Sequence, residues 1–471
     1  MRSLRVAAVV ALAALAAPAS ALAHSGLSQR QNLPIPDWLF AWAAAAVLVV
    51  SFGALAVLWP EPRLEKAGWR PLPGGLGRAL GSRAVEIVCG ALGVALLVLT
   101  IVGGYVGVNT GAANFAPAFI LIIFWVGLVF GSIVFGDVFR AISPWRAIGR
   151  ATGAILGRRA PAPRPYPERL GRWPAALVLL IFPWIELVGK WDAVPHTLVS
   201  AALGYTVITL AAQAIYGTET WTRRGEGFAV YFNFFSRISP FETRDRVVGL
   251  RPPLAGLPKL DPVPGTVAVV VVMIGTVTFD GLSQGPLWAS VLPDLVDAFT
   301  SIGFGPVAAE KLAGTVGLLF GVGLIGGFYT LGMEGARSVG GGMTLERLRR
   351  IFIHTLVPIA AVYVAAHYLT YFVYDGQRII YLASDPFGQG SDLFGTATRG
   401  VDYSVLSQNG AWYLEVAFVV VGHVAALTLA HDRALSVYGQ AKLAVRSQYW
   451  MLGVMVGFTS LALWLLVNAG K

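Results

Sequence analysis

The feature that most constrains this chain is a succession of long apolar segments that recur along almost its whole length. Each approaches the ~20 residues that a helix needs to cross the hydrocarbon core of a bilayer. We therefore expect an all-α, polytopic integral membrane protein with about ten transmembrane helices. The lipid bilayer is then one of its partners. The ten segments lie near residues 38–59, 84–106, 116–138, 173–190, 196–216, 264–282, 312–333, 351–374, 411–431 and 447–468.

The composition agrees with this prediction. Of the 471 residues, 56% are hydrophobic and 13% are charged, whereas soluble domains carry about 25% charged residues. So few charges cannot cover the surface of the two or three soluble domains that this length would otherwise suggest. The composition thus excludes a cytosolic enzyme and a disordered chain. The single cysteine, Cys89, excludes a disulfide framework and a metal site built from cysteines.

Residues 1–23 have the three parts of a secretory signal peptide. Arg2 and Arg5 form a basic start, a short apolar core follows, and Ala21-Leu22-Ala23 matches an A-x-A cleavage site. The apolar core is too short to cross a bilayer comfortably, which favours removal over anchoring. We expect cleavage after Ala23.

The mature chain, residues 24–471, is then a single transmembrane helical domain whose N-terminus lies outside the cell membrane. With this orientation the predicted cytoplasmic connections hold 27 of the 35 Lys and Arg residues, and the external segments hold six. The cytoplasmic connections are residues 60–83, 139–172, 217–263, 334–350 and 432–446. This asymmetry follows the positive-inside rule, so the net charge of +10 describes topology and does not indicate a nucleic-acid partner.

Four connections are long enough to have a character of their own. The cytoplasmic loop 139–172 is basic and proline-rich, which suits contact with anionic headgroups. The cytoplasmic loop 217–263 contains an aromatic run over residues 228–235, which predicts an interfacial helix. The external loops 283–311 and 375–410 are rich in Gly, Asp and Pro, and long loops often carry binding residues.

Ionisable residues inside apolar segments are the best candidates for a functional site, because each costs several kcal/mol unless it is paired or hydrated. Three imidazoles and three carboxylates fall toward the predicted external face, and these are ligands that suit zinc or another borderline metal. Each histidine could instead hydrogen-bond to a backbone carbonyl within its own helix. The six residues are Glu186, His196, Asp280, His367, Glu415 and His423.

These residues lead to a metal hypothesis. His367 and His423 would bind a divalent metal, zinc or copper, while Glu415 or Glu186 acts as a ligand or a general base. His196 and Asp280 are further candidate ligands. His24 could add copper ligands, because a histidine made N-terminal by cleavage offers its amine and its ring nitrogen together.

The two remaining histidines, His354 and His431, fall near the predicted cytoplasmic edge, where we expect both side chains to reach the interface.

Several stretches resemble a group of actinobacterial-type multi-spanning proteins labelled fenitrothion hydrolase. The resemblance implies a membrane-bound hydrolase of hydrophobic organophosphate triesters, with a site open to the external face. The stretches are His24-Ser25-Gly26, residues 33–36 and 38–42, residues 136–140 with 144–146, residues 384–388 with 392–395, and residues 431–435.

Two other classes of protein stay open. Ten helices with glycine-rich packing and ionisable residues inside them also suit a secondary transporter, for copper or for a small hydrophobic compound. A subunit of a larger membrane complex is the third possibility, with a membrane-protein partner. Phosphotriester hydrolysis needs an activated water and a cation near the phosphoryl oxygen, which the metal hypothesis would supply.

Overall fold

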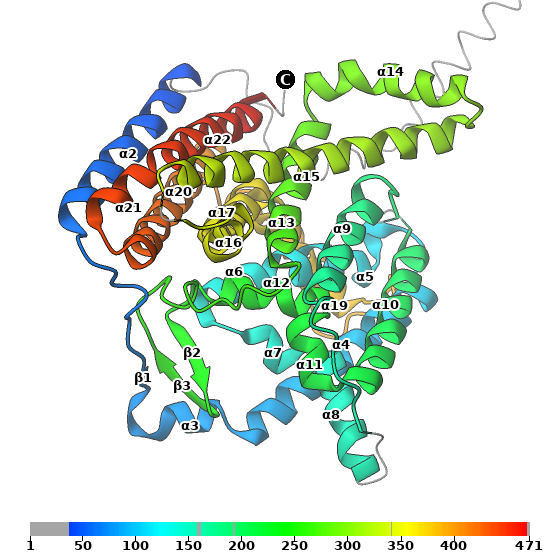
Figure 1. Ribbon diagram of the computed structural model, residues 1–471. Coiled ribbons are helices and arrows are strands. Elements are labelled where there is room, and N and C mark those ends of the chain that lie inside the picture. Colours follow the sequence, from blue (N-terminus) through cyan, green and yellow to red (C-terminus); the bar gives the residue numbers. More distant parts are fainter. Residues whose placement is uncertain (1–36, 158–161, 192–193, 341, 469–471) are drawn as a thin grey trace, which may run out of the picture.

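The computed structural model describes residues 37–157, 162–191, 194–340 and 342–468 (Figure 1). The predicted signal peptide and His24 lie outside the described residues. Helices make up nearly all of the regular structure, so the all-α class is confirmed. Seven of the helices in the described residues are long and apolar enough to cross a membrane.

Every predicted apolar segment that falls on described residues forms helix. Three of the ten segments form helices outside those seven: α2, α9 and α22, of which α9 has only 15 residues. The helices are α2 (Asp37–Leu58), α4 (Arg83–Val106), α5 (Phe115–Pro117) continuing through η4 (Ala118–Gly127) into α6 (Leu128–Phe135), α9 (Trp173–Leu187), α10 (Pro195–Tyr216), α13 (Thr266–Ser283), α15 (Pro306–Ser338), α16 (Leu345–Phe352) with η6 (Ile353–Leu356), α17 (Val357–His367) and α18 (Leu369–Val373), α20 (Gln408–Tyr438) and α22 (Tyr449–Asn468).

The segments predicted as loops contain shorter helices. In the external segment, α14 runs back along the N-terminal part of α15, and the two helices extend from the body as a hairpin (Figure 1). The shorter helices are η2 (Pro73–Gly75), α3 (Leu76–Leu80), η3 (Gly111–Ala113), α7 (Val138–Ile142), α8 (Pro144–Leu156), α11 (Thr218–Arg224), α12 (Gly227–Ser236), α14 (Pro286–Ser301), η7 (Asp375–Gln377), α19 (Arg378–Ser384) and α21 (Ala441–Ser447).

The aromatic run in the 217–263 segment forms α12, and the prediction of an interfacial position for it is wrong. Phe232, Phe234 and Phe235 are fully buried, and α12 packs against α6 and α9 inside the bundle. The reason is that apolar side chains surround nearly the whole helix, since Ala229 and Val230 are buried on the sides that the aromatic residues do not cover. A helix that is apolar on all sides is buried, whereas an interfacial helix needs one polar face.

A small antiparallel sheet lies at one end of the bundle, in the strand order β1-β3-β2. The strands are β1 (Arg70–Pro71), β2 (Phe241–Arg244) and β3 (Val247–Leu250). Asp245 and Arg246 connect β2 to β3 with φ angles of 47° and 63°. This two-residue left-handed turn matches the twist of the paired strands, which explains the tight hairpin.

Contacts between connections agree with the predicted sides of the membrane. The sheet joins two segments that were both predicted to be cytoplasmic, since β1 lies in 60–83 and β3 in 217–263. Arg146 forms an ion pair of 2.6 Å with Glu219, which joins segments 139–172 and 217–263. The Tyr438 hydroxyl donates to the Ala336 carbonyl at 3.0 Å, which joins the predicted cytoplasmic segments 432–446 and 334–350.

The predicted external segments are joined to one another in the same way. The Val108 N–H donates to the Phe387 carbonyl at 2.9 Å. Lys190 and Glu310 form an exposed ion pair at 3.3 Å. Grouping of the connections into two sets is what the predicted alternation of helices requires.

A single buried carboxylate holds the end of α2 to α20. Asp432 is fully buried, and its Oδ1 accepts from the Trp59 indole at 2.9 Å and from the N–H groups of Arg63 and Leu64 at 2.6 and 3.1 Å. Its Oδ2 accepts from the N–H of Glu65 at 3.0 Å. These four bonds satisfy the backbone where the chain leaves α2, and we call this group of residues the Asp432 clamp.

The neighbours of Asp432 in the sequence strengthen the same contact. Arg433 forms an ion pair with Glu65 at 2.9 Å. The His431 ring bonds to the Trp59 carbonyl at 3.1 Å and to Gln448 at 3.2 Å. The prediction that His431 reaches the interface is therefore wrong, since it is only 1% exposed and both its ring nitrogens have partners inside the protein.

The same prediction for His354 is also wrong. This residue lies in η6, the short turn between α16 and α17, and its side chain is 3% exposed. The break in the helix directs the imidazole into the bundle, away from the interface.

We expect Asp432→Ala to lower the thermal stability of the detergent-purified protein by several degrees. The substitution leaves three backbone N–H groups and an indole without their acceptor, at a cost of about 3 kcal/mol or more. The measurement is the unfolding midpoint followed by intrinsic tryptophan fluorescence. Asp294→Ala, an exposed position on α14, is the matched control and should leave the midpoint unchanged. Equal midpoints for both variants would show that the clamp contributes nothing.

Candidate functional site

A polar contact that includes an ionisable pair lies inside the apolar helices and is centred on Asp280, near the C-terminal end of α13. This side chain is 1% exposed. A hydrogen bond of 2.9 Å joins its Oδ2 to Nε2 of His367, and the Tyr368 hydroxyl donates to the same oxygen at 2.7 Å. Gln284 donates to Oδ1 at 3.0 Å. The carboxylate thus has partners on both oxygens.

A break between two helices allows His367 and Tyr368 to reach the same carboxylate. Helix α17 ends at His367, and α18 begins at Leu369 after Tyr368 adopts φ −103° and ψ 14°. Successive side chains on a regular α-helix point about 100° apart, which would direct the two groups to different neighbours. The non-helical backbone at Tyr368 brings them together.

Further polar groups surround this contact. Glu186 of α9 is 7% exposed, and its charge acts on the Tyr368 hydroxyl. Tyr363 of α17 lies beside Thr278 of α13 and within the field of Asp280. Helices α9, α13 and α17 therefore contribute to one polar group. We call Asp280, His367, Tyr368 and Glu186 the Asp280 centre.

The helices that carry His367 and His423 are neighbours, since α17 and α20 pack along each other. They approach closely at Gly422, where a Cβ would collide with the side chain of Val362. On α20, His423 is 2% exposed and bonds through Nδ1 to the Val419 carbonyl at 2.7 Å. Its buried Nε2 has no hydrogen-bond partner among the described residues. Glu415 is also buried on α20, at 4% exposure.

The other predicted ligands do not join this centre. His196 is exposed in the first turn of α10, and its ring packs edge-on against Tyr105 with 4.7 Å between the centroids. Within the described residues, no group of three or more His, Cys, Asp or Glu side chains is arranged to hold a metal ion. The structure thus joins Asp280 to His367, with Glu186 buried on α9, which packs against α13, but it does not collect His367, Glu415 and His423 into one ligand set.

Sequence reasoning missed Tyr368 and Gln284. A tyrosine in an apolar run counts as part of the run, so its hydroxyl gives no signal of its own. Gln284 lies just beyond the predicted end of its segment. The position of Tyr368 directly after His367 is the one feature that could have suggested it.

Sequence reasoning also missed the buried carboxylate of Glu226. It is 1% exposed and accepts from the N–H groups of Phe228 and Ala229 at 2.9 and 2.8 Å, and from the Tyr205 hydroxyl. It caps the N-terminus of α12, where a negative charge also favours the helix dipole. Burial raises the pKa of Glu226 to about 7, although these three donors act to lower it.

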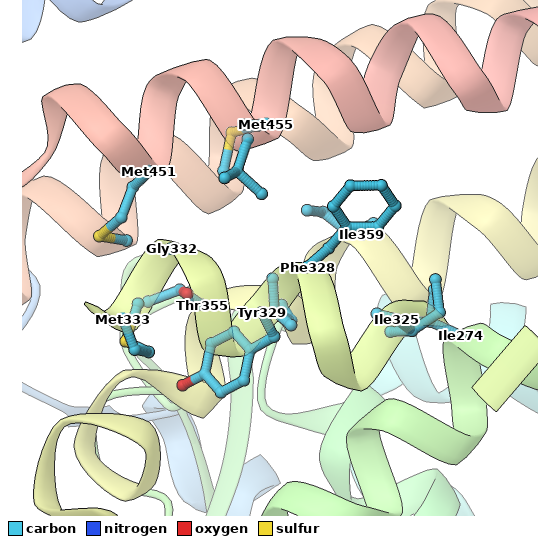
Figure 2. Close-up of a pocket in the computed structure, with 12 residues that line it drawn as sticks. Ile274, Ile325, Phe328, Tyr329, Gly332, Met333, Thr355, Ile359, Met451 and Met455 are labelled. Atoms are coloured by element: carbon cyan, nitrogen blue, oxygen red, sulfur yellow. The ribbon is translucent and has the colours of Figure 1, made fainter. Parts of the chain in front are cut away.

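An apolar cavity of about 50 Å³ lies between α13, α15, α17 and α22 (Figure 2). Met333, Met451 and Met455 line it, and no acidic or basic side chain does so among the described residues. The Tyr329 hydroxyl donates to the Arg349 carbonyl at 2.7 Å, so this phenol is already satisfied. Methionine side chains adapt to guests of different shape, which suits a binding space more than a reactive one.

The fold and the site define a class: a helical protein with seven helices, among the described residues, that are long and apolar enough to cross a membrane, and with a buried Asp–His–Tyr contact. No protein-family model, no curated protein and no solved structure matches the chain. The function is therefore argued from the Asp280 centre itself.

We expect Glu226→Gln to flatten the dependence of stability on pH. Because the pKa of Glu226 is raised from 4.5 to about 7 on folding, its contribution to stability is fully present below pH 4.5 and is lost as the pH rises through 7. The difference is on the order of 3 kcal/mol. Unfolding midpoints measured from pH 4.5 to 8 should fall more steeply for the unmodified protein than for the variant.

The matched control for this experiment is Glu168→Gln, at an exposed position in the proline-rich segment. Its profile should follow that of the unmodified protein. Parallel profiles for Glu226→Gln and the unmodified protein would contradict the raised pKa.

Proposed function

We propose that this chain is a secondary transporter in the cell membrane, and that the Asp280 centre carries the proton that drives it. The observation that supports this most directly is the hydrogen bond between Asp280 and His367 inside the apolar helices. An ionisable pair at such a position is expensive to maintain, and in membrane proteins such pairs mark ion or proton pathways.

The chemistry of the pair suits a proton carrier. Asp280 and His367 together change their net charge by one when a proton is gained or lost. The hydroxyl of Tyr368 donates to the carboxylate and stabilises its charged form. A change of net charge in an interior of low dielectric constant changes the free energy of burying the Asp280–His367 pair. The two protonation states therefore favour different arrangements of the helices around the pair.

The helix break supplies a place where the arrangement can change. Non-helical backbone within a spanning helix is found where it faces a cavity or a binding site, and broken helices often carry transporter sites. Tyr368 both forms the break between α17 and α18 and donates a hydrogen bond to Asp280. Protonation of the centre is thus coupled directly to the geometry of the break.

The lining of the apolar cavity favours a hydrophobic substrate, although a cavity of about 50 Å³ would have to widen to admit one. Ile274 lines the cavity and lies six residues before Asp280 on α13, which is about 9 Å along the helix axis. Ile359 also lines it and lies eight residues before His367 on α17, about 12 Å along that axis. The cavity and the centre therefore lie on the same two helices, so a change in the position of either helix would affect both.

A membrane hydrolase of organophosphate triesters is the second candidate. The observation that favours it is the hydrogen bond between Asp280 and His367, because a carboxylate bonded to one ring nitrogen of an imidazole orients the ring to act as a general base. His367 would remove a proton from water, the resulting hydroxide would attack phosphorus, and the aryloxide would leave. Glu186 or Glu415 would then assist as the second carboxylate, with a divalent metal as the expected source of positive charge.

Proteoliposomes and detergent-purified protein, both given a p-nitrophenyl phosphotriester, separate the two candidates. For the transporter, adding the compound should speed the decay of an imposed pH gradient without release of nitrophenolate. His367→Ala should abolish this effect. For the hydrolase, nitrophenolate should appear, and His367→Ala should slow its release by about 100-fold or more.

The matched control is His196→Ala, an exposed histidine that contacts Tyr105. It should behave as the unmodified protein in both assays. Unchanged behaviour of His367→Ala in both assays would rule out a role for the Asp280 centre, and inhibition by a chelator would favour the metal-dependent hydrolase.

A further inference from the structure

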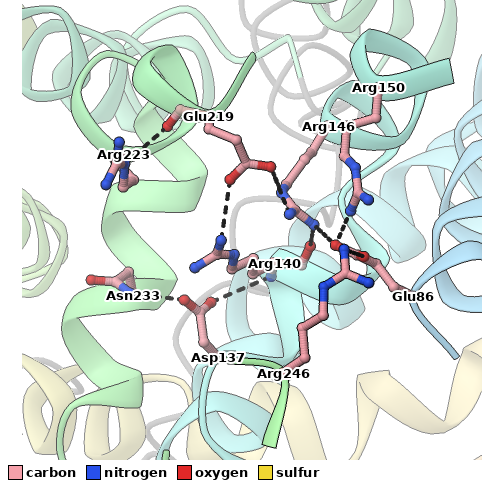
Figure 3. Close-up of polar contacts among 9 residues, drawn as sticks. All are labelled: Glu86, Asp137, Arg140, Arg146, Arg150, Glu219, Arg223, Asn233 and Arg246. Carbon is pink, nitrogen blue, oxygen red and sulfur yellow. Dashed lines mark hydrogen bonds and ion pairs between the residues drawn. The ribbon is translucent and has the colours of Figure 1, made fainter. Parts of the chain in front are cut away.

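A second polar region lies among α7, α8, α11 and α12, on the side predicted to be cytoplasmic. It contains two adjoining cavities of about 490 and 770 Å³. The lining is rich in arginine, and part of it is drawn in Figure 3. Both cavities are lined by Asp137, Arg140, Glu219, Arg223, Asn233 and Arg237.

Several of these arginines are neutralised within the wall. Arg146 lies between two carboxylates, at 2.6 Å from Glu86 and 2.6 Å from Glu219 (Figure 3). Arg140 pairs with Glu219 at 3.1 Å, and Arg150 pairs with Glu86. This network joins α4, α8 and α11. The charges of Arg140, Arg146 and Arg150 therefore serve to hold these helices together.

Three other arginines line the smaller cavity without such neutralisation. In the part of the chain that the structure describes, Arg172, Arg223 and Arg237 form no ion pair with a carboxylate within 4.0 Å. Arg172 is 5% exposed, and its Nε has no hydrogen-bond partner. Uncharged acceptors take the remaining contacts, such as Asn233 Oδ1 at 3.2 Å from Nε of Arg237.

Two carboxylates on the same wall, Asp137 and Asp261, are already engaged, and the exposed Glu168 also lines the cavity. Asp137 accepts from the Arg140 N–H at 3.3 Å and from the Asn233 amide at 2.8 Å (Figure 3). Asp261 forms an ion pair with Arg224 at 3.5 Å. The cavity therefore presents guanidinium groups that have more donors than the wall has free acceptors.

The arginines also act on one another. Burial lowers the pKa of Arg172 to about 10, and the nearby charge of Arg237 lowers it further in the same direction. Burial also lowers the pKa of Arg237, with the charge of Arg251 as the next cause. Like charges held this close destabilise each other unless an anion lies between them.

We propose that the smaller cavity binds the phosphate group of an anionic ligand through Arg172, Arg223 and Arg237. A guanidinium donates two parallel N–H groups, which match two phosphoryl oxygens, and the charge of a phosphate offsets the repulsion between the arginines. A lipid headgroup from the cytoplasmic leaflet and a soluble phosphorylated compound both carry this group. The proposal is independent of the Asp280 centre, which lies on other helices.

Inorganic phosphate and phosphatidylglycerol are the two probes that test this site. Phosphate affinity is measured on the detergent-purified protein from the rise in unfolding midpoint with phosphate concentration, at constant ionic strength. Lipid binding is measured by native mass spectrometry as retention of phosphatidylglycerol relative to phosphatidylcholine. We expect Arg237→Gln and Arg223→Gln each to weaken binding of the effective probe at least about tenfold.

The controls separate loss of the site from loss of the fold. Arg246 lines only the larger cavity and lies 3.7 Å from Glu86. The control variant Arg246→Gln should therefore change the affinity by less than about twofold. Arg223 is exposed, so its substitution leaves the core intact and decides the question if Arg237→Gln does not fold. Arg237→Lys, which keeps the charge and loses the paired donors, should weaken binding less than Arg237→Gln.

Phosphate binding that the variants lose identifies a soluble ligand. Selective retention of phosphatidylglycerol that they lose, without phosphate binding, identifies a lipid headgroup. If neither probe binds, or if Arg246→Gln weakens binding as much as the other two, the proposal is overturned.

Discussion

A polar group buried inside a helical bundle finds no water there, so the protein must supply its partners. Asp432 meets this requirement with four hydrogen bonds that join the ends of α2 and α20. Asp280 meets it with three, from His367, Tyr368 and Gln284. Much of the architecture follows from these pairings, because each can form only if particular helices lie side by side.

The two buried aspartates differ in what their partners can do. The partners of Asp432 are an indole and backbone N–H groups, none of which exchanges a proton near neutral pH, so the contact is structural. Asp280 instead faces an imidazole, which titrates near neutral pH when free. A carboxylate and an imidazole that share a hydrogen bond can move a proton, which makes the Asp280 centre a place for chemistry or for coupled transport. The arginine-lined cavity is a separate region, built for an anion.

Long apolar segments are a local signal, so the sequence predicted nearly every long helix in the described residues. Burial of particular groups was harder to predict. The aromatic run of α12 was expected at the interface, and His431 was expected to reach it, yet both are buried. Of the six outer candidates, Asp280 and His367 are bonded to each other, while His196 lies apart against Tyr105. Tyr368 escaped notice because its hydroxyl belongs to a residue type that also fits an apolar helix.

The sequence by itself determined that the chain is helical, that its helices suit a membrane, and how its basic residues divide between the two predicted faces. These properties depend on hydrophobicity and charge, which act residue by residue. Only the tertiary structure decided that Asp280 meets His367 and Tyr368, and that Arg172 and Arg237 lie in one cavity, where neither forms an ion pair with a carboxylate of the described residues. Hydrogen bonds require atoms within about 3 Å, and which distant helices meet that closely depends on how the whole bundle packs.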